Sequence, residues 1–298
     1  AIRRQRQMCI RDRMTKCMRS YVQFLCLGGE RMYIDTHTKE TIEASVCEYL
    51  GFTKDELKLF FDSAYYSRKP VEEEISDFVD KTMPEIRLDE IQFYHLSRRL
   101  LDDNSRVGNN LYDLLTQDTS VSRFLREHDV EFKMNEGHLL LFHRGKIETF
   151  ERVYEGNVSN VKWRMGYFKG HEDYCVNGFA LKDMLHENSY TISLRSCPEF
   201  IEQMSLVIGR KDIIRDYERN SRYYCLEYLV PMDKVIFDGF SYKTQYSKTK
   251  HLLCVVLKRL YEYEFNSRYM YDHDNLILRL EDDDTMQEEY FIAEEEIK

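Results

Sequence analysis

The hydrophobic pattern of the chain changes near residue 130, and this change limits which folds the chain can adopt. Up to that point, apolar residues recur at the three- and four-residue spacing of helices. They predict helices at 36–51, 53–66, 70–81, 87–101 and 110–128. Beyond it, short β-branched and aromatic runs separated by Gly, Asn or Pro are typical of strands. They predict strands at 130–134, 138–144, 189–194, 223–230, 234–238, 275–280 and 288–292.

A long helical pattern at 247–265 interrupts these strands, so strands and helices do not alternate regularly. This order predicts an α+β fold, in which an N-terminal helical region is followed by a mixed, largely antiparallel sheet domain with a long helix. We expect the helical domain to span 32–130 and the α+β domain to span 131–298.

Local signals mark several of the predicted helix ends. Gly51 stands where the end of a helix favours a left-handed residue. Thr53 and Glu56 have the spacing of a capping box, which predicts that a helix begins there. Pro70 begins the next helix and precedes glutamates that suit a first turn.

The first 31 residues differ from the rest of the chain. AIRRQRQMCIRDR, at 1–13, resembles translated sequencing-adapter read-through. GGER, at 28–31, is what an in-frame ribosome-binding site would encode. We therefore expect a native start at Met32 and a protein of bacterial or phage origin. The alternative is an ordinary basic N-terminal arm.

The charge of the chain bears on its partners. Its formal net charge is −10, and residues 1–31 are its basic part, so the remainder is more acidic still. An acidic surface repels phosphate backbones, so we expect no general nucleic-acid affinity, although a local basic site could hold one nucleotide. A basic patch at 97–99, on a predicted helix, suggests a DNA-binding module, but its acidic surroundings favour a packing or partner-docking surface.

The cysteines and the hydropathy pattern indicate in which cellular compartment we expect the protein. The eight cysteines form no CxxC pair and no zinc-type spacing with histidine, which favours reduced, mostly buried thiols in a cytoplasmic protein. No window approaches about 18 consecutive apolar residues, so we expect no membrane span. The basic start also lacks the apolar core of a secretory signal.

Most short motifs of catalysis are missing. The chain has no GxSxG, GxxxxGK[ST], GxGxxG or HExxH sequence. His-Asp doublets at 128–129 and 273–274, and the run HEDYC at 171–175, offer ligand types for a metal, but their spacing matches no established metal site. We expect no metal site, and a metal-dependent hydrolase using His171 or His273 is the third functional hypothesis.

One apolar strand-like run, HLLLFH, ends abruptly in His143, Arg144 and Gly145. Its sequence resembles the first nucleotide-binding strand of the ADP-ribosyltransferase family, in which an Arg or His holds NAD. Only one of His143 and Arg144 can face a cleft, because adjacent side chains on a strand point to opposite faces. The structural alternative is a strand end that turns at Gly145, with Arg144 paired to an exposed acid such as Glu148.

The same family carries a Glu, often in a QxE or ExE motif, on a later strand. Gln287-Glu288-Glu289 resembles this element, so Glu289 matches the catalytic Glu and Gln287 its substrate-facing neighbour. The alternative is a polar turn before an edge strand. Glu227 alternates with apolar neighbours, so it lies on the solvent face or takes the place of Glu289 as the family's Glu.

The family's middle strand supplies a Ser or an aromatic residue, and two segments are candidates for it. One is 173–183, where Ala180 departs from the pattern. The other is 189–196, where Ser193 or Tyr190 takes the role. The sequence does not decide between them.

The chemistry of the family explains these residue types. Cleavage of the nicotinamide N-glycosidic bond builds positive charge on the ribose, which a carboxylate stabilises, and the diphosphate requires a cation. The resemblance implies an NAD-dependent ADP-ribosyltransferase with NAD as substrate and a protein acceptor. The competing hypothesis is a non-catalytic module whose acidic surface binds a protein partner.

Overall fold

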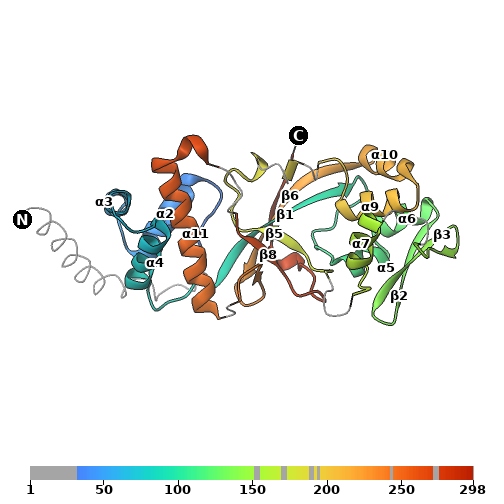
Figure 1. Cartoon of the computed structure of the whole chain (residues 1–298), viewed down its shortest axis with the longest axis horizontal. Helices are drawn as coiled ribbons and strands as arrows, with labels where there is room; N and C mark the ends of the chain where they lie inside the picture. Colours follow the sequence, from blue (N-terminus) through green and yellow to red (C-terminus); the bar gives the residue numbers. More distant parts are fainter. Residues whose placement is uncertain are drawn as a thin grey trace, which may run out of the picture. The chain divides into compact units, whose positions relative to one another are not determined.

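The computed structural model describes residues 32–150, 155–168, 173–187, 191–192, 195–241, 244–270 and 275–297. The predicted α+β fold with antiparallel sheets is confirmed (Figure 1). Two compact units make up the chain. One joins the N-terminal residues up to Ile91 with Tyr242–Met270, and the other joins Gln92–Ser241 with Tyr271–Lys298.

The first unit is helical. It contains α2 (Lys39–Leu50), α3 (Lys54–Tyr65), α4 (Val71–Thr82), α11 (Gln245–Phe265) and the 3-10 turn η2 (Ser267–Tyr269). The long helix α11 packs on α2 and α4 through buried residues that include Leu252, Val256 and Leu260.

The predicted helix ends of this unit are confirmed. Gly51 ends α2 in the left-handed region with φ 70°. Thr53 and Glu56 form the capping box of α3, and Pro70 is the N-cap of α4. These ends were predictable because a cap depends only on residues adjacent in sequence.

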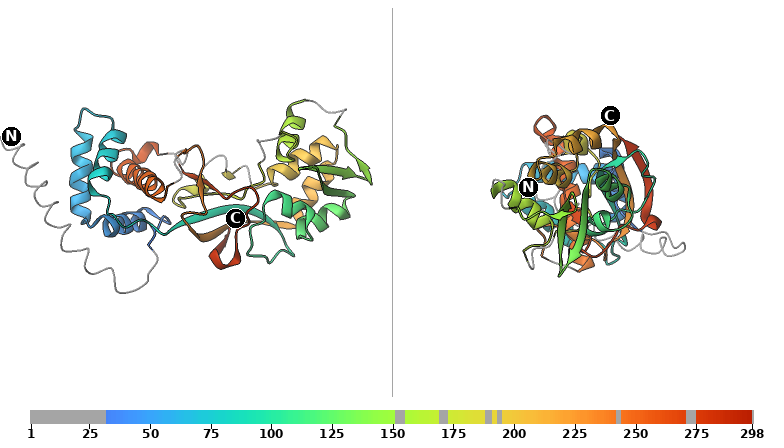
Figure 2. Two further views of the ribbon diagram at one scale, coloured as in Figure 1. Left: turned by 90° about the horizontal axis from the view of Figure 1, so that it is seen from below. Right: turned by 90° about the vertical axis from the view of Figure 1, so that its right-hand side faces the viewer.

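The second unit contains a six-stranded sheet in the order β7-β8-β5-β1-β6-β9. Its strands are β1 (Glu90–Leu100), β5 (Asn177–Phe179), β6 (Ser221–Pro231), β7 (Ile236–Phe237), β8 (Ile277–Arg279) and β9 (Phe291–Glu296). Its longest described strands, β1 and β6, are neighbours in the sheet (Figure 2). The N–H of Leu101 donates to the carbonyl of Asn220, so the end of β1 lies beside the start of β6 and the two strands run antiparallel.

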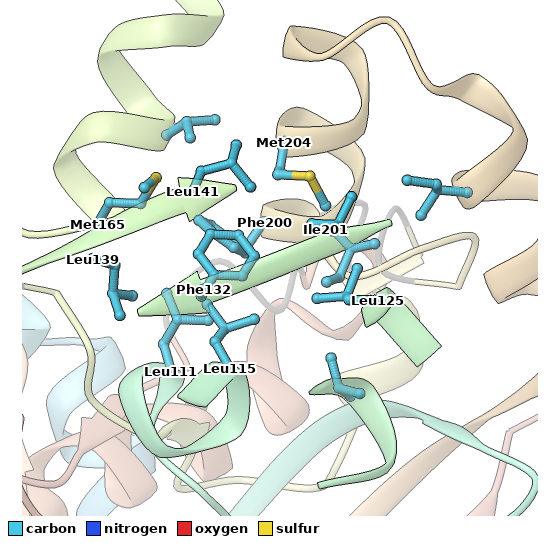
Figure 3. Close-up of a cluster of buried hydrophobic side chains, with 14 of the residues drawn as sticks. Leu111, Leu115, Leu125, Phe132, Leu139, Leu141, Met165, Phe200, Ile201 and Met204 are labelled. Atoms are coloured by element: carbon cyan, nitrogen blue, oxygen red, sulfur yellow. The ribbon is translucent and has the colours of Figure 1, made fainter. Parts of the chain in front are cut away.

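A second sheet of three strands belongs to the same unit. Its strands are β2 (Val130–Asn135), β3 (His138–His143) and β4 (Lys146–Ile147). Short helices of the same unit lie on its buried side: α5 (Leu111–Thr116), α6 (Ser120–Glu127), α7 (Glu155–Arg164), α9 (Glu199–Val207) and α10 (Lys211–Arg219). Alternate residues of β2 and β3, among them Phe132 and Leu141, form a buried core with apolar residues of the helices (Figure 3). The remaining short elements are η1 (Leu185–Glu187) and η4 (Glu288–Tyr290).

The prediction of a helix at 87–101 was wrong, because this segment is the central strand β1. Five consecutive residues from Glu90 to Tyr94 are buried, so both faces of the strand are covered there. A strand that is covered on both faces lacks the alternation that identifies a half-buried strand, and its periodicity does not separate it from a buried helix.

The two units also differ from the predicted domains 32–130 and 131–298. The N-terminal part of the helical unit ends at Ile91, and α11 belongs to this unit although more than 150 residues separate α11 from α4. The side-chain amide of Gln245, at the start of α11, donates a hydrogen bond to the carbonyl of Leu88, which links the two parts of the unit. Only residues 191–192 of the predicted strand at 189–194 are described, and they are helical. The helices α7, α9 and α10 were not predicted.

Among the described helices, none combines the length and the apolar character that crossing a bilayer requires. The described cysteines are free thiols, and all of them except Cys254 are buried.

Candidate functional site

The basic doublet that ends β3 forms a tight turn. His143 pairs with Lys146, so Arg144 and Gly145 are the two loop residues of the β3–β4 hairpin. Both have positive φ, 52° and 72°, as a type I′ turn requires. Arg144 and Gly145 are exposed. The turn geometry therefore accounts for the abrupt end of this strand without a ligand.

His143 lies at the base of this turn and is half-buried. Its Nε2 atom is 3.5 Å from Nη1 of Arg210. Burial, followed by the positive charges of Arg144 and Arg210, lowers the pKa of His143. A histidine with a lowered pKa is neutral at pH 7 and cannot serve as the cation for a diphosphate. Arg210 itself forms an ion pair of 2.7 Å with Asp212.

The predicted carboxylate motif lies at a turn that precedes a strand of the other sheet. Gln287 and Glu289 are exposed at the 3-10 turn η4, which leads into β9. The side-chain amide of Gln287 donates to Oγ1 of Thr285 at 2.8 Å. In the part of the chain that the structure describes, no hydrogen bond or ion pair joins His143 or Arg144 to Gln287 or Glu289. The structure therefore shows no direct contact between the two halves of the predicted pair within the described residues.

Glu227 takes a different position. It lies on β6, an interior strand between β1 and the edge strand β9, and only 5% of it is exposed, so of the two alternatives the solvent-facing one is wrong. Its Oε1 atom accepts a hydrogen bond of 3.3 Å from Nε2 of Gln92 on the neighbouring strand β1. A buried carboxylate is costly, so a carboxylate held in one orientation in the middle of a sheet is a candidate for function.

Three further polar groups lie around Glu227. Alternate residues share a face of a strand, so Glu227 shares a face with Cys225, which pairs with Glu295 across the β6–β9 ladder. Glu295 forms an ion pair of 3.0 Å with Lys182. Lys182 is close enough to Glu227 for the charge of that carboxylate to act on it. We call Glu227, Gln92, Lys182 and Glu295 the candidate carboxylate site.

The electrostatics of this site limit the role of each group. Burial opposes the charge of Lys182, but the hydrogen bond and charge of Glu295 outweigh it and raise the pKa of the ammonium. Burial raises the pKa of Cys225 to about 12, so this thiol stays protonated and is no nucleophile at neutral pH. Burial lowers the pKa of the adjacent His186. The site thus offers two carboxylates, one of them buried and one paired with Lys182, together with one amide and one cation.

Gln92 and Lys182 were not predicted as site residues from the sequence. Gln92 was missed because its segment was predicted to be helical, and no local signal places it beside Glu227. A signal for Glu227 was present, since it alternates with apolar residues in YYCLEYLV. That alternation leaves open which face is covered.

Several of the other residues that were predicted as site residues or metal ligands are not described by the structure. Ser193, Tyr190, His171 and His273 lie outside the described residues. Within the described ranges, no group of three or more His, Cys, Asp or Glu side chains could hold a metal ion. The His128 ring caps the end of α6, where Nδ1 lies 2.8 Å from the Phe124 carbonyl and Nε2 lies 3.3 Å from Asp216.

The basic patch at 97–99 is part of strand β1, so it is not on a recognition helix. Arg98 donates to Oγ of Ser221 at 2.8 Å and to the carbonyl of Glu218 at 2.7 Å. These bonds tie β1 to the junction between α10 and β6. Arg98 therefore has a structural role that does not require nucleic acid.

His95 on β1 should make the stability of the second unit depend on pH. Its ring is half-buried, Nδ1 lies 2.7 Å from the Asn177 carbonyl, and burial lowers its pKa from 6.5 to about 4. The unfolded chain therefore binds more protons than the folded chain between these values, so stability is full above pH 6.5 and falls as the pH drops towards 4.

We expect this fall to be about 1–2 kcal/mol, after allowance for partial exposure of the ring. The measurement is urea unfolding at pH 7 and pH 5 for the wild type and for His95→Gln, which keeps a donor but does not titrate. Equal losses of stability in both proteins would contradict the prediction.

Comparison of the chain with protein-family models, with curated proteins and with solved structures finds no match.

Proposed function

We propose that the protein cleaves the nicotinamide N-glycosidic bond of NAD and transfers the ADP-ribose, and that Glu227 rather than Glu289 is the carboxylate of this reaction. The observation that carries the proposal is the burial of Glu227 on the interior strand β6, where Gln92 holds its orientation through a hydrogen bond of 3.3 Å. The exposed Glu289 has no comparable support.

The chemistry requires a carboxylate of this kind. The bond between C1′ of the ribose and the ring nitrogen breaks, and nicotinamide leaves with the electron pair. The ribose then carries positive charge shared between C1′ and its ring oxygen. A carboxylate held beside this charge stabilises it more strongly in a low-dielectric setting than in water. A nucleophile bonds to C1′ and loses its proton. Water as nucleophile yields free ADP-ribose, whereas an acceptor side chain yields the modified protein.

The other members of the candidate carboxylate site have roles in this proposal. Gln92 positions the carboxylate through its amide and is a positioning residue. Lys182 is a cation whose charge interacts with that of Glu227, and it would meet a diphosphate by exchanging its ion pair with Glu295. Arg144, exposed on the hairpin turn of the other sheet, has no role in this version of the proposal.

The test compares two glutamates that differ in burial. The full chain is incubated with NAD labelled on its adenylate part and with a cell lysate as the source of acceptors. Released nicotinamide and labelled protein are both measured. We expect Glu227→Gln to lower the rate on the order of 100-fold, because it removes the charge and keeps the shape. Glu289→Gln and Arg144→Ala should stay within about twofold of the wild type, since surface changes rarely propagate.

Thermal unfolding of each variant separates loss of chemistry from loss of folding. A Glu227→Gln protein that unfolds like the wild type and still releases nicotinamide at the wild-type rate would refute the assignment. If Glu289→Gln alone removed activity, the exposed motif would be the true site. No release of nicotinamide by the wild type would refute the proposed function as a whole.

A further inference from the structure

The strand β9 is an edge of the six-stranded sheet. It follows η4 and pairs with β6 on one side. In the part of the chain that the structure describes, no strand pairs with its other side. Ile292 to Glu296 are all exposed, and Ile292 is 55% exposed at the irregular step of the ladder. A strand that is exposed on both faces and open along one edge can accept another strand.

The register shows which backbone groups of β9 are directed outward. The N–H of Ile297 donates to the carbonyl of Tyr223 at 2.8 Å. Bonded and non-bonded pairs alternate along an antiparallel ladder, so Glu295 with Cys225 is also a bonded pair. The intervening residues Glu294 and Glu296 therefore direct their N–H and C=O groups away from β6. These groups are the donors and acceptors that an added strand would bind.

The side chains of this edge are acidic. Glu294, Glu295 and Glu296 are consecutive, and Glu288 and Glu289 immediately precede the strand. Lys182 neutralises Glu295 and Arg222 neutralises Glu296, each through one ion pair. No ion pair of Glu294 is found within the described residues. The open edge therefore carries excess negative charge.

This charge determines which strand the edge can accept. A second copy would place glutamates against glutamates, and like charges directly opposite each other are destabilising. An extended segment rich in Lys or Arg would instead pair its cations with these glutamates while its backbone continues the sheet. Opposite charge also raises the rate of encounter.

We propose that β9 binds an extended, basic segment of a partner protein by adding it as a seventh strand next to β9. The glutamate side chains of β9 account for the preference for a basic segment. The outward N–H and C=O groups of Glu294 and Glu296 form the hydrogen bonds with the backbone of the added strand. The exposed Ile292 offers an apolar contact at the end of the strand near η4. This binding does not require NAD, so it stands apart from the proposed function.

The first experiment tests the charge. The full chain is titrated into a short fluorescent peptide of alternating Lys and Val, and binding is followed by anisotropy at low and moderate salt. A peptide of alternating Glu and Val is the control. We expect only the basic peptide to bind, with affinity that falls as salt screens the charges. Glu294→Lys should weaken binding about tenfold or more, because it replaces attraction by repulsion next to the bound strand.

Glu202→Lys is the matched control, since Glu202 is exposed on α9 and the change in net charge is the same. We expect it to bind the basic peptide within about twofold of the wild type, because a distant exposed charge is screened. Equal weakening by both variants would show that only the overall charge matters, and would overturn the proposal.

A second experiment tests the backbone. Glu294→Pro removes one outward N–H without touching the bonds to β6, and proline is tolerated on an edge strand. Glu294→Gln makes the same change in charge and keeps the N–H. We expect the proline variant to bind about fivefold more weakly than the glutamine variant, roughly the loss of one hydrogen bond. Equal binding by the two would exclude strand addition.

Sedimentation of the free protein tests whether a second copy of the chain binds at the β9 edge. We expect no self-association that depends on β9. A dimer that Glu294→Pro dissolves would mean that a second copy occupies the edge, and the proposal would fail.

Discussion

Replacing Phe132 with Ala should lower the free energy of unfolding of the second unit by about 3–5 kcal/mol. Phe132 lies on β2, is 4% exposed, and contacts the ring of Phe200 with a centroid distance of 5.7 Å. It faces the core between the three-stranded sheet and its helices (Figure 3). Removing a ring from a close-packed core loses its transfer free energy and leaves a cavity that neighbours fill only in part.

Phe142→Ala is the matched control for this prediction. Phe142 is on the adjacent strand β3, pairs with Glu131 and Ile147, and is half-buried under the ammonium of Lys133. The same chemical change on this face should cost about 1 kcal/mol, because less apolar area returns to water. Urea unfolding of both variants measures the difference. Equal losses would mean that the core does not lie on the face that contains Phe132.

Replacing Gly166 with Ala should lower the free energy of unfolding by about 2–5 kcal/mol, for two reasons that add. Gly166 follows α7 and has φ 78°, a conformation that is unfavourable for any residue with a Cβ atom. A Cβ atom would also lie 3.0 Å from Cζ of Tyr174 and closer still to its Oη, and 3.1 Å from the Gly137 carbonyl. Tyr174 is buried, so it cannot move aside into solvent.

Gly145→Ala is the control that separates the cost of the backbone conformation from the cost of the clash with Tyr174. Gly145 has nearly the same conformation, with φ 72°, but a Cβ atom there would meet nothing within 4 Å. Its replacement should cost only the backbone part, about 1 kcal/mol. Thermal or urea unfolding of both variants gives the comparison. A Gly166→Ala protein no less stable than Gly145→Ala would show that Tyr174 does not pack against this turn.

The candidate site was only partly predictable. The sequence singled out Glu227 as a glutamate among apolar neighbours, but alternation alone fits a solvent-facing and a buried side chain equally. Its partner Gln92 is 135 residues away in sequence. No local pattern relates residues at that separation, because their contact depends on which strands become neighbours in the sheet.

The hairpin turn at 143–146, in contrast, has a signal in the local sequence. A glycine preceded by a polar residue between two strand-like runs is a local signal for a two-residue turn. From the sequence, both a turn and a nucleotide-binding strand end were possible here. The turn accounts for Arg144 and Gly145, so the resemblance to a first nucleotide-binding strand has no support from their geometry.

Local chemistry in the sequence determined the helix caps at Thr53 and Gly51, because neighbours within four residues make those interactions. It also predicted the strands β2 and β3, which are close in sequence and pair across a short turn. Only the tertiary structure decided that 90–100 is a central strand, that α11 belongs to the helical unit, and that Glu227 is buried against Gln92. Each of these depends on burial by residues distant in the chain. Burial is a property of the assembled sheet and helices, and a segment with mixed apolar and polar residues does not carry it in its own pattern.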